Sequence, residues 1–242
     1  MLRSRAVKER LARRPEAIRR MFAAVAPRYD LLNRLLSLRQ DVRWRRRLVA
    51  ALAAAPPGAV LDLATGTGDV AFAIRGRSVT GADFCVDMLA LARAKAQRRA
   101  QNARWVAADG LALPFREGAF AAVTVAFGVR NFADLTAGLA EIRRVLASQG
   151  VLAIVEFQRP TRAAMRLAML AWNRLVVEPV GSLLSRDPAA YAYLPASVET
   201  FPGRGELARQ VAAAGYTVES SSELSGGIVA LTVARAPRRE GA

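Results

Sequence analysis

The chain has 242 residues, 53% of them hydrophobic, which is enough for one large core and predicts a single α/β domain with an added lid rather than two full domains. Its single cysteine excludes an intramolecular disulfide and a multi-cysteine zinc site, and the absence of histidine excludes serine–histidine and histidine–metal chemistry, so we expect no metal. The formal net charge of +16 leaves both an anionic lipid and a nucleic acid open as partners.

The first 57 residues are predicted to form a basic helical arm ahead of the main domain. Residues 1–47 hold fifteen Lys/Arg against four Asp/Glu, or +11 of the net charge. Helical patterns cover Pro15–Val25 and Leu31–Ala55, and the breaker Pro56-Pro57-Gly58 ends the arm. The arm could bind anionic lipid, where each basic group contributes about 1 kcal/mol, or nucleic acid, or carry only solvated charge. No apolar run of 18 residues and no secretory signal pattern is present, so we expect no membrane span.

From residue 58 to residue 242, strand and helix patterns alternate as a doubly wound α/β sheet requires. The predicted strands cover residues 59–64, 78–83, 104–108, 120–126 and 150–157, and the predicted helices cover 68–75, 85–99 and 133–147. The alternation stops after Glu156, so residues 159–201 are predicted to be a lid insertion of helix and loop. A helix over 203–214 and an antiparallel hairpin of Tyr216–Leu224 and Ile228–Ala234 complete the predicted sheet.

The most informative segment is the glycine turn after the first predicted strand, Asp62-Leu63-Ala64-Thr65-Gly66-Thr67-Gly68-Asp69. A doubly wound sheet binds nucleotides at such a turn, where glycine allows a positive φ or a close approach to the ligand. The three-glycine pattern of a pyrophosphate site is incomplete and no Gly-Lys-Ser/Thr follows, so a phosphate cradle is unsupported. A glycine turn that serves packing alone is the alternative.

Two further predicted strands also end in a carboxylate. Asp83 follows the second strand, at the place where an acid can accept both hydroxyls of a ribose. Asp109-Gly110 follows the third strand, and Leu113-Pro114-Phe115 supplies an apolar wall beside it, a setting that fits a purine. Asp109 alone could be a helix cap. Three acidic strand ends in order, Asp62 being the first, favour an adenosyl cofactor.

These motifs resemble those of the S-adenosylmethionine-dependent class I methyltransferases. A closer resemblance lies upstream, where Phe22–Ser37 followed by Trp44 is similar to the entry motif of the menaquinone and ubiquinone C-methyltransferases of the UbiE/MenG type. The resemblance covers nearly the whole chain after about Met21. It continues through Phe127-Gly128-Val129-Arg130-Asn131, Arg144-Val145-Leu146, Val155-Glu156-Phe157 and Tyr193–Val198.

The chain departs from the family pattern at two places. The family's histidine, three residues before the tryptophan, is replaced by Asp41, which puts any role of that histidine in doubt. The family's Lys-Pro-Gly-Gly turn reads Ala147-Ser148-Gln149-Gly150, which weakens a turn and not a site.

The resemblance implies S-adenosylmethionine as cofactor and an arm over residues 1–57 that covers it. The cofactor-binding positions that it implies are Asp62, Thr65, Gly66, Thr67, Gly68, Asp83, Asp109, Gly110 and Ala126. The implied reaction is C-methylation of demethylmenaquinol in menaquinone biosynthesis, with C-methylation of a polyprenyl benzoquinol in ubiquinone biosynthesis as the alternative. Methyl transfer from a sulfonium requires mainly that the reactants are aligned and water is excluded.

Arg130 and Asn131 are the candidate catalytic residues, since they follow the fourth predicted strand at the edge that faces the crevice. Arg130 is too basic to remove a proton, so we expect it to stabilise a phenolate of the quinol while water or a nearby carboxylate takes the proton. In the alternative interpretation Arg130 only pairs with a carboxylate of the fold, and Glu156 could equally have a structural role.

Candidate substrate and lid residues lie on both sides of the sheet domain in sequence. Tyr29, Asp30 and Asn33 belong to the segment expected to fold over the cofactor, whereas Tyr191, Tyr193 and the apolar face of Arg162–Leu184 could wall an isoprenoid channel. Packing in the core is the alternative for each of them.

The expected partners are a polyprenylated quinol and a membrane surface contacted by the basic arm, with a cytoplasmic location at the inner face of the membrane. Nucleic acid is not expected, because Ala126-Phe127-Gly128-Val129 replaces the Asn-Pro-Pro-Tyr type of loop after the fourth strand. A cofactor-binding protein without turnover is the third hypothesis. The sequence leaves a monomer and a homodimer both open.

Overall fold

The computed structural model describes residues 15–177, 179 and 188–239, and of Pro15, residues 188–192 and Leu194 it describes only the main chain. The beginning of the predicted arm, residues 1–14, and the middle of the predicted lid therefore lie outside the described residues. Among the helices of the described part, none is long and apolar enough to cross a bilayer.

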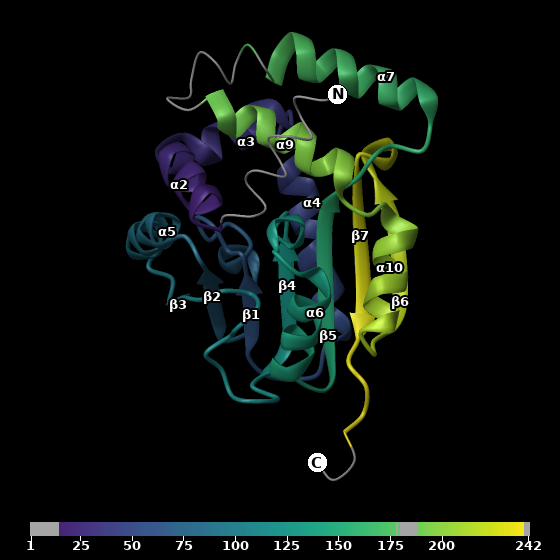
Figure 1. Cartoon of the computed structure of the whole chain (residues 1–242). Coiled ribbons are helices and arrows are strands. Elements are labelled where there is room, and N and C mark those ends of the chain that lie inside the picture. The colour runs from purple at the N-terminus through teal and green to yellow at the C-terminus, as the bar shows by residue number, and fades with distance from the viewer. Residues whose placement is uncertain (1–14, 178, 180–187, 240–242) are drawn as a thin grey trace.

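A seven-stranded sheet forms the middle layer of the molecule (Figure 1). Its strands are β1 (Val60–Leu63), β2 (Val79–Asp83), β3 (Arg104–Ala107), β4 (Phe120–Ala126), β5 (Leu146–Phe157), β6 (Thr217–Leu224) and β7 (Val229–Arg235). They follow the order β3-β2-β1-β4-β5-β7-β6, in which β1 to β5 are parallel and β7 pairs antiparallel with both β5 and β6. The five predicted parallel strands and the final hairpin are thus confirmed.

The strand order reverses at β1, which pairs with β2 on one side and with β4 on the other. In this register Leu63 lies opposite Ala82 and Val125, so the carboxyl ends of the three strands meet at one edge. A reversal of this kind opens the crevice in which α/β proteins bind ligands.

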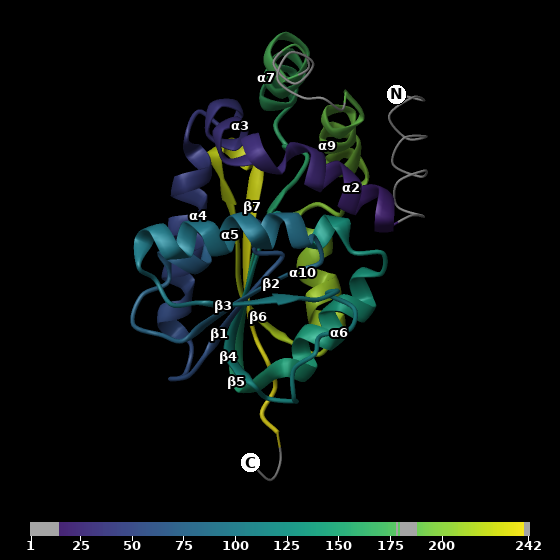
Figure 2. The ribbon, with the colours of Figure 1, turned by 90° about the vertical axis from the view of Figure 1, so that its left-hand side faces the viewer.

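Helices cover both faces of the sheet. α6 (Leu135–Val145) and α10 (Arg204–Ala213) lie on one face and α4 (Gln40–Ala50), continued by the 3₁₀ turn η2 (Ala51–Ala54), lies on the other (Figure 1). Alternate residues of each strand enter the two cores, since Leu61 packs with Ile142 whereas Val60 packs with Leu48. α5 (Val86–Arg99) runs alongside β2 and β3 (Figure 2).

In the described part of the chain, four more helices lie beyond the carboxyl edge of the parallel strands (Figures 1 and 2). They are α2 (Pro15–Val25), α3 (Tyr29–Leu36), α7 (Ala163–Trp172) and α9 (Pro188–Thr200). The 3₁₀ turn η1 (Ala26–Arg28) joins α2 to α3, and the π-helical segment η5 (Asn173–Val177) continues α7. The arm and the lid, far apart in sequence, thus meet at one end of the molecule, where α2 contacts α9.

The predicted single helix Leu31–Ala55 is wrong, because the chain turns at Leu38 and Arg39. Both residues adopt a positive φ, of 50° and 60°, which ends one helix before the next begins. The hydroxyl of Ser37 donates to Asp41 Oδ1 (2.8 Å) and accepts from the main-chain nitrogen of Asp41 (3.3 Å), which stabilises the start of α4. The turn lets α3 lie over the strand ends while α4 packs Leu48 on the sheet.

The predicted helix over residues 68–75 is also wrong, since only the 3₁₀ turn η3 (Ala71–Ala73) forms there. Val70, Ala71, Phe72 and Ile74 are all buried. Neighbouring positions cannot all face the core from one side of an α-helix, so the segment folds as a compact turn.

Two smaller predictions need correction. β5 starts at Leu146 rather than 150, and the expected turn at Ala147–Gly150 lies within it, with Gln149 at a φ of 58°. Leu113 is part of the core and Phe115 packs on Phe120 with ring centroids 4.9 Å apart, so the expected apolar wall lies elsewhere.

Candidate active site

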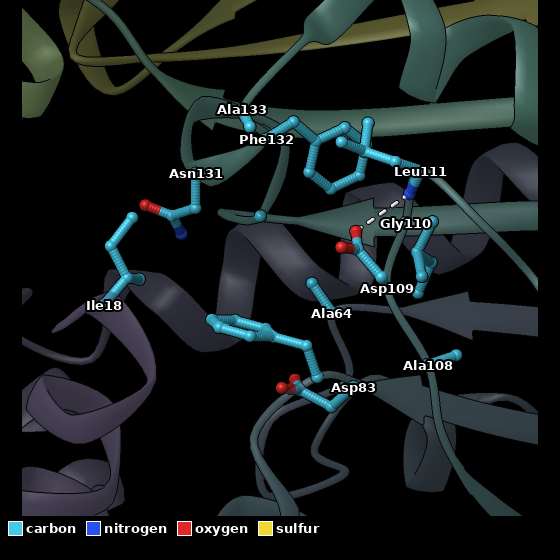
Figure 3. A pocket seen from close by; sticks show the side chains of 13 residues that line it. Ile18, Ala64, Asp83, Ala108, Asp109, Gly110, Leu111, Asn131, Phe132 and Ala133 are labelled. Carbon is cyan, nitrogen blue, oxygen red and sulfur yellow. Dashed lines mark hydrogen bonds between the residues drawn. The ribbon is translucent and has the colours of Figure 1, made fainter. Parts of the chain in front are cut away.

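A pocket opens at the carboxyl edge where the strand order reverses, and Figure 3 shows the side chains around it. Each of the central strand ends contributes to its lining. The lining residues are Ile18, Leu63, Ala64, Asp83, Phe84, Ala108, Asp109, Gly110, Leu111, Gly128, Asn131, Phe132 and Ala133. The pocket therefore brings together four predicted site residues, namely Asp83, Asp109, Gly110 and Asn131.

Asp62 is buried beneath the glycine turn, which it holds through hydrogen bonds, and it does not line the pocket. Its carboxylate accepts from the hydroxyls of Thr65 (2.5 Å) and Thr124 (2.9 Å) and from the main-chain nitrogen of Ala71 (3.1 Å). Burial raises the pKa of Asp62 to about 6, although these hydrogen bonds act in the opposite direction. The carboxylate thus joins β1, its turn and β4 into one unit.

Asp83 is the acid that faces the pocket at the end of β2. Its two oxygens accept from the main-chain nitrogens of Gly66 (2.8 Å) and Cys85 (2.9 Å). Burial raises the pKa of Asp83, and hydrogen bonds from main-chain nitrogens partly oppose that change. A carboxylate has about four lone-pair sites, so Asp83 can accept from two further hydroxyls.

The two glycines of the turn are required for different reasons. Gly66 has a φ of 56°, and a side chain there would meet only the ring of Tyr29, at 3.9 Å. Gly68 has a φ of 85°, and a Cβ atom would lie 2.7 Å from Trp105 and 2.9 Å from Phe72. Packing and the positive φ both require glycine at position 68, whereas at position 66 it is the conformation, which brings the Gly66 nitrogen to Asp83, that requires glycine.

Asp109 and Gly110 form the far side of the pocket. Asp109 is exposed, and its Oδ1 accepts from the main-chain nitrogen of Leu111 at 3.0 Å (Figure 3). No helix begins between β3 and β4, all of whose residues are described, so Asp109 is not a helix cap. The apolar wall consists of Phe84, Leu111 and Phe132, and a Cβ atom on Gly110 would lie 2.7 Å from the Phe132 ring.

Gly128 brings the chain after β4 into contact with the chain after β1. A Cβ atom on Gly128 would lie 2.5 Å from the Cβ atom of Ala64. Both residues line the pocket. The two loops can touch there because residue 128 has no side chain.

Arg130 is directed into the fold rather than into the pocket. Its Nη1 lies 2.9 Å from Oε1 of Glu156, and the side chains of the two residues are only 7% and 1% exposed. Arg130 also donates to the Phe127 carbonyl and, through Nε, to Ser197 Oγ at 3.3 Å. Burial raises the pKa of Glu156, and the charge of Arg130 opposes that rise. This arrangement matches the alternative in which Arg130 pairs with a carboxylate of the fold.

Asn131, the next residue, connects the pocket to the lid. The hydroxyl of Tyr193 in α9 donates to Asn131 Oδ1 at 2.8 Å. Tyr193 is 3% exposed and packs with Ile18 and Met21 of α2. Burial raises the pKa of the Tyr193 hydroxyl. Arm and lid thus close over the pocket on the side of Asn131, next to Ile18 (Figure 3).

An ionic cluster that we term the latch attaches the arm to the glycine turn. It consists of Asp30, Arg45, Thr67, Asp69 and Lys95. Asp30 accepts from the Thr67 hydroxyl (2.6 Å) and pairs with Lys95, which also donates to Asp69 (3.0 Å). Burial acts to raise the pKa of Asp69, but Arg45 and Lys95 outweigh it and lower that pKa.

The remaining predicted site residues lie outside the pocket lining. Tyr29 covers Gly66, and Asn33 lies one turn further along α3, where its carbonyl accepts from the Ser37 nitrogen (3.0 Å). Ala126 packs in the core on the α4 face of the sheet. The side chain of Tyr191 is outside the described part of the chain.

Sequence reasoning missed Phe84, Leu111 and Phe132 of the pocket wall and Asp69, Lys95 and Arg45 of the latch. Phe84 directly follows the ribose-type acid, and Lys95 is one of two lysines in a chain with 36 basic residues. The position of Phe84 and the rarity of lysine are visible in the sequence, but neither shows which side chains the fold brings together.

Residues 8–235 match the family model of the ubiE/COQ5 methyltransferase family. The chain belongs to this family. The demethylmenaquinone methyltransferase of Thermus thermophilus is 48% identical over 221 residues, which are 90% of this chain and 100% of that protein. The ubiquinone/menaquinone biosynthesis C-methyltransferase UbiE of Citrifermentans bemidjiense is 40% identical over 92% of this chain and 97% of that protein.

A solved structure supports the same fold class. The SAM-dependent methyltransferase of Aquifex aeolicus superposes with a TM-score of 0.58 at 16% identity, covering 79% of this chain and 89% of that chain. The fold is therefore the α/β class I methyltransferase fold, as the sequence predicted.

Proposed function

We propose that this methyltransferase uses S-adenosylmethionine to convert demethylmenaquinol into menaquinol. The observation that carries the proposal is the pocket at the reversal of strand order, where two carboxylates with unused lone pairs, Asp83 and Asp109, face apolar walls. Membership of the ubiE/COQ5 family and the name of the relative from Thermus thermophilus support the reaction.

The pocket residues fit an adenosyl group. Asp83 would accept the two ribose hydroxyls, and Asp109 would accept from an exocyclic amino group of the purine. Phe84, Leu111 and Phe132 offer flat or branched apolar surface to the purine rings. When bound, S-adenosylmethionine supplies a methyl group activated by its sulfonium.

The glycine turn contributes to the proposed cofactor site because hydrogen bonds hold it in place. Asp62 and Thr65 hold the turn, Gly66 ties it to Asp83, and Thr67 ties it to the arm. We include Gly68, Gly110 and Ala126 in the cofactor region because their small size lets neighbouring groups pack closely there.

The substrate side of the proposed reaction is formed by Asn131 with Tyr193. Their hydrogen bond leaves the amide nitrogen of Asn131 to donate to a quinol oxygen, while the apolar residues Ile18 and Phe132 exclude water. The quinol loses a phenolic proton to water, and its ring carbon takes the methyl group as the bond between that group and the sulfonium sulfur breaks, with the electron pair of that bond staying on sulfur. The ring C–H proton then passes to water, which restores aromaticity, and the phenolate oxygen regains a proton from water. Arg130 acts as a positioning residue, because its guanidinium binds Glu156 and the Phe127 carbonyl beside Asn131. Its positive charge opposes the rise in the pKa of the Tyr193 hydroxyl and would favour a quinol phenolate in the same way.

The proposal includes a polyprenyl chain on the substrate and contact with a membrane surface. Tyr29, Asp30 and Asn33 would close the arm over the cofactor, and Tyr193 of α9 would border the isoprenoid. A basic arm over residues 1–57 that contacts lipid stays a prediction, since residues 1–14 lie outside the described part.

The test is methyl transfer from labelled S-adenosylmethionine in detergent. Reduced demethylmenaquinone, a demethylated benzoquinol and total RNA are offered side by side, with Asp83→Ala as the cofactor-deficient control. Label in the naphthoquinol is expected. Label in the benzoquinol alone would favour the ubiquinone pathway, in line with the name of the relative from Citrifermentans bemidjiense. Label in RNA alone would contradict both, and bound cofactor without transfer would favour a non-catalytic protein.

A further inference from the structure

α7 is an apolar helix that buries none of its side chains. Apart from Arg166, all residues from Ala163 to Trp172 are apolar. Leu167 and Leu170 are 67% and 64% exposed, and Leu175 in the following η5 is 74% exposed. Clustered exposed leucines are unfavourable in water and mark a surface that binds something apolar.

The arm contributes a second row of exposed leucines at the same end of the molecule. Leu31, Leu35 and Leu38 are 55%, 50% and 65% exposed, and the first two lie four residues apart on one side of α3. Trp172 Nε1 donates to the carbonyl of Leu36 at 3.2 Å, so the end of α7 is attached to the end of α3. Both views show the two helices beyond the carboxyl edge of the sheet (Figures 1 and 2). We term this surface the leucine face, comprising Leu31, Leu35, Leu38, Leu167, Leu170 and Leu175.

Arginines neighbour the leucines of this face along the chain. Arg39, Arg162, Arg166 and Arg174 are all exposed. Neither residues 31–40 nor residues 159–177 contain an aspartate or glutamate. The combination of exposed leucines and arginines without acids is complementary to the headgroups and upper acyl chains of an anionic bilayer.

We propose that the leucine face inserts into the surface of an anionic lipid bilayer, with α7 lying along the interface. A second copy of this chain is a poorer occupant, because the charged residues of α7, η5 and residues 31–40 are all arginines, so a two-fold interface over this face would bring like charges together without a compensating acid from these segments. The proposal deepens the proposed function, since it gives a polyprenylated quinol an entry route. α9, which brings Tyr193 to Asn131, lies between α7 and the sheet (Figure 1).

The first test is flotation of the full chain with vesicles, without cofactor or quinol. Vesicles of phosphatidylcholine alone are compared with vesicles that also contain phosphatidylglycerol. The triple variant L167S/L170S/L175S is compared with V86S, which changes a 51% exposed valine on α5 outside the leucine face. We expect the chain and V86S to bind the anionic vesicles and the triple variant to lose at least tenfold in affinity. Equal binding by the triple variant would overturn the proposal.

The basic residues at the start of the arm provide the competing explanation, and R3Q/R5Q/R10Q tests it. Loss of vesicle binding in this variant but not in the triple variant would assign the membrane contact to residues 3–10 and overturn the proposal. Sedimentation without lipid tests the other occupant: a dimer that the triple variant converts into a monomer would show that the leucine face joins two copies.

Activity separates this inference from the proposed function. Methyl transfer to a short-chain, water-soluble demethylmenaquinol should be the same in the chain and the triple variant, whereas transfer to a long-chain quinol in vesicles should fall with vesicle binding. Binding that depends on the leucine face, together with no transfer to any quinol, would retain the membrane proposal and reject the proposed reaction.

Discussion

Asp83 Oδ2 accepts a hydrogen bond from the main-chain nitrogen of Gly66 at 2.8 Å. The acid that ends β2 is thereby bound to the glycine turn that follows β1, so the two features by which the sequence indicates an adenosyl site form one structural unit. A change at either residue is expected to act on the other.

Asp83→Ala should weaken cofactor binding. The variant removes the acceptor of two proposed ribose hydroxyls, and hydrogen bonds to a charged group contribute about 1.5–3 kcal/mol each, so the dissociation constant should rise by at least about tenfold. Calorimetric titration with S-adenosylmethionine or its demethylated product measures the change. Unchanged affinity in a folded variant would remove Asp83 from the cofactor site.

Arg130→Ala should lower turnover, keep cofactor affinity nearly unchanged and destabilise the fold. It leaves the carboxylate of Glu156, which is 1% exposed, without its partner, and breaking a buried ion pair costs about 3–5 kcal/mol. Denaturant unfolding and methyl-transfer rates are measured together.

The double variant R130M/E156M separates the two roles of Arg130. It removes both charges and should recover most of the stability. If Arg130 supports the phenolate, turnover stays low in the double variant. Recovery of turnover along with stability would leave Arg130 a purely structural role, and equal cofactor loss in Arg130→Ala and Asp83→Ala would contradict its placement on the substrate side.

Tyr193→Phe should reduce kcat while the cofactor dissociation constant stays the same. The variant removes the hydroxyl that orients Asn131, and the loss of one neutral hydrogen bond of about 1 kcal/mol predicts a several-fold effect. Tyr216→Phe is the matched control, because the Tyr216 hydroxyl donates to the Leu139 carbonyl (2.9 Å) within the α6 core. The control should lose stability and retain kcat; a similar loss of kcat in both variants would point to packing rather than orientation.

The contribution of Asp62 to stability should fall as the pH rises. Its pKa is about 6 in the fold against an ordinary value of 3.8, so the folded state holds the proton more tightly than the unfolded chain does. The contribution is fully present below about pH 4 and is lost as the pH rises through 6, by about 3 kcal/mol for the shift of about two pKa units. Unfolding free energies of the chain and of Asp62→Asn are compared between pH 4 and 7. A difference that does not change with pH would show that Asp62 is ionised throughout.

Lys95→Gln should loosen the arm. Lys95 is 15% exposed and pairs with Asp30 and Asp69, so its loss leaves two partly buried carboxylates with less compensation. Hydrogen exchange in residues 15–36 should become about tenfold faster, for an opening cost lowered by about 1.4 kcal/mol. Arg20→Gln is the control, because the Arg20–Glu16 pair is 80% and 77% exposed and should contribute almost nothing.

The positions of the strands along the chain and the acids at their ends could be predicted from the sequence, because buried strands and the turns after them leave local patterns. For that reason the predicted residues Asp83, Asp109 and Asn131 do lie at the pocket. The break at Leu38 could not be predicted, since leucine and arginine at positive φ carry no local signal and the turn depends on how α4 packs. The direction of Arg130 depends on Glu156, 26 residues away, which local patterns cannot report.

The contact between Gly128 and Ala64 gives the pocket a floor made by a glycine and the methyl group of an alanine. Neither residue has a side-chain rotamer, so the position of this floor is determined by the spacing of β1 and β4 in the sheet. The walls are different, because Ile18, Leu111 and Phe132 belong to a helix and to loops rather than to strands. A naphthoquinol and a benzoquinol site can therefore differ in the residues above the sheet while the floor of the pocket stays the same.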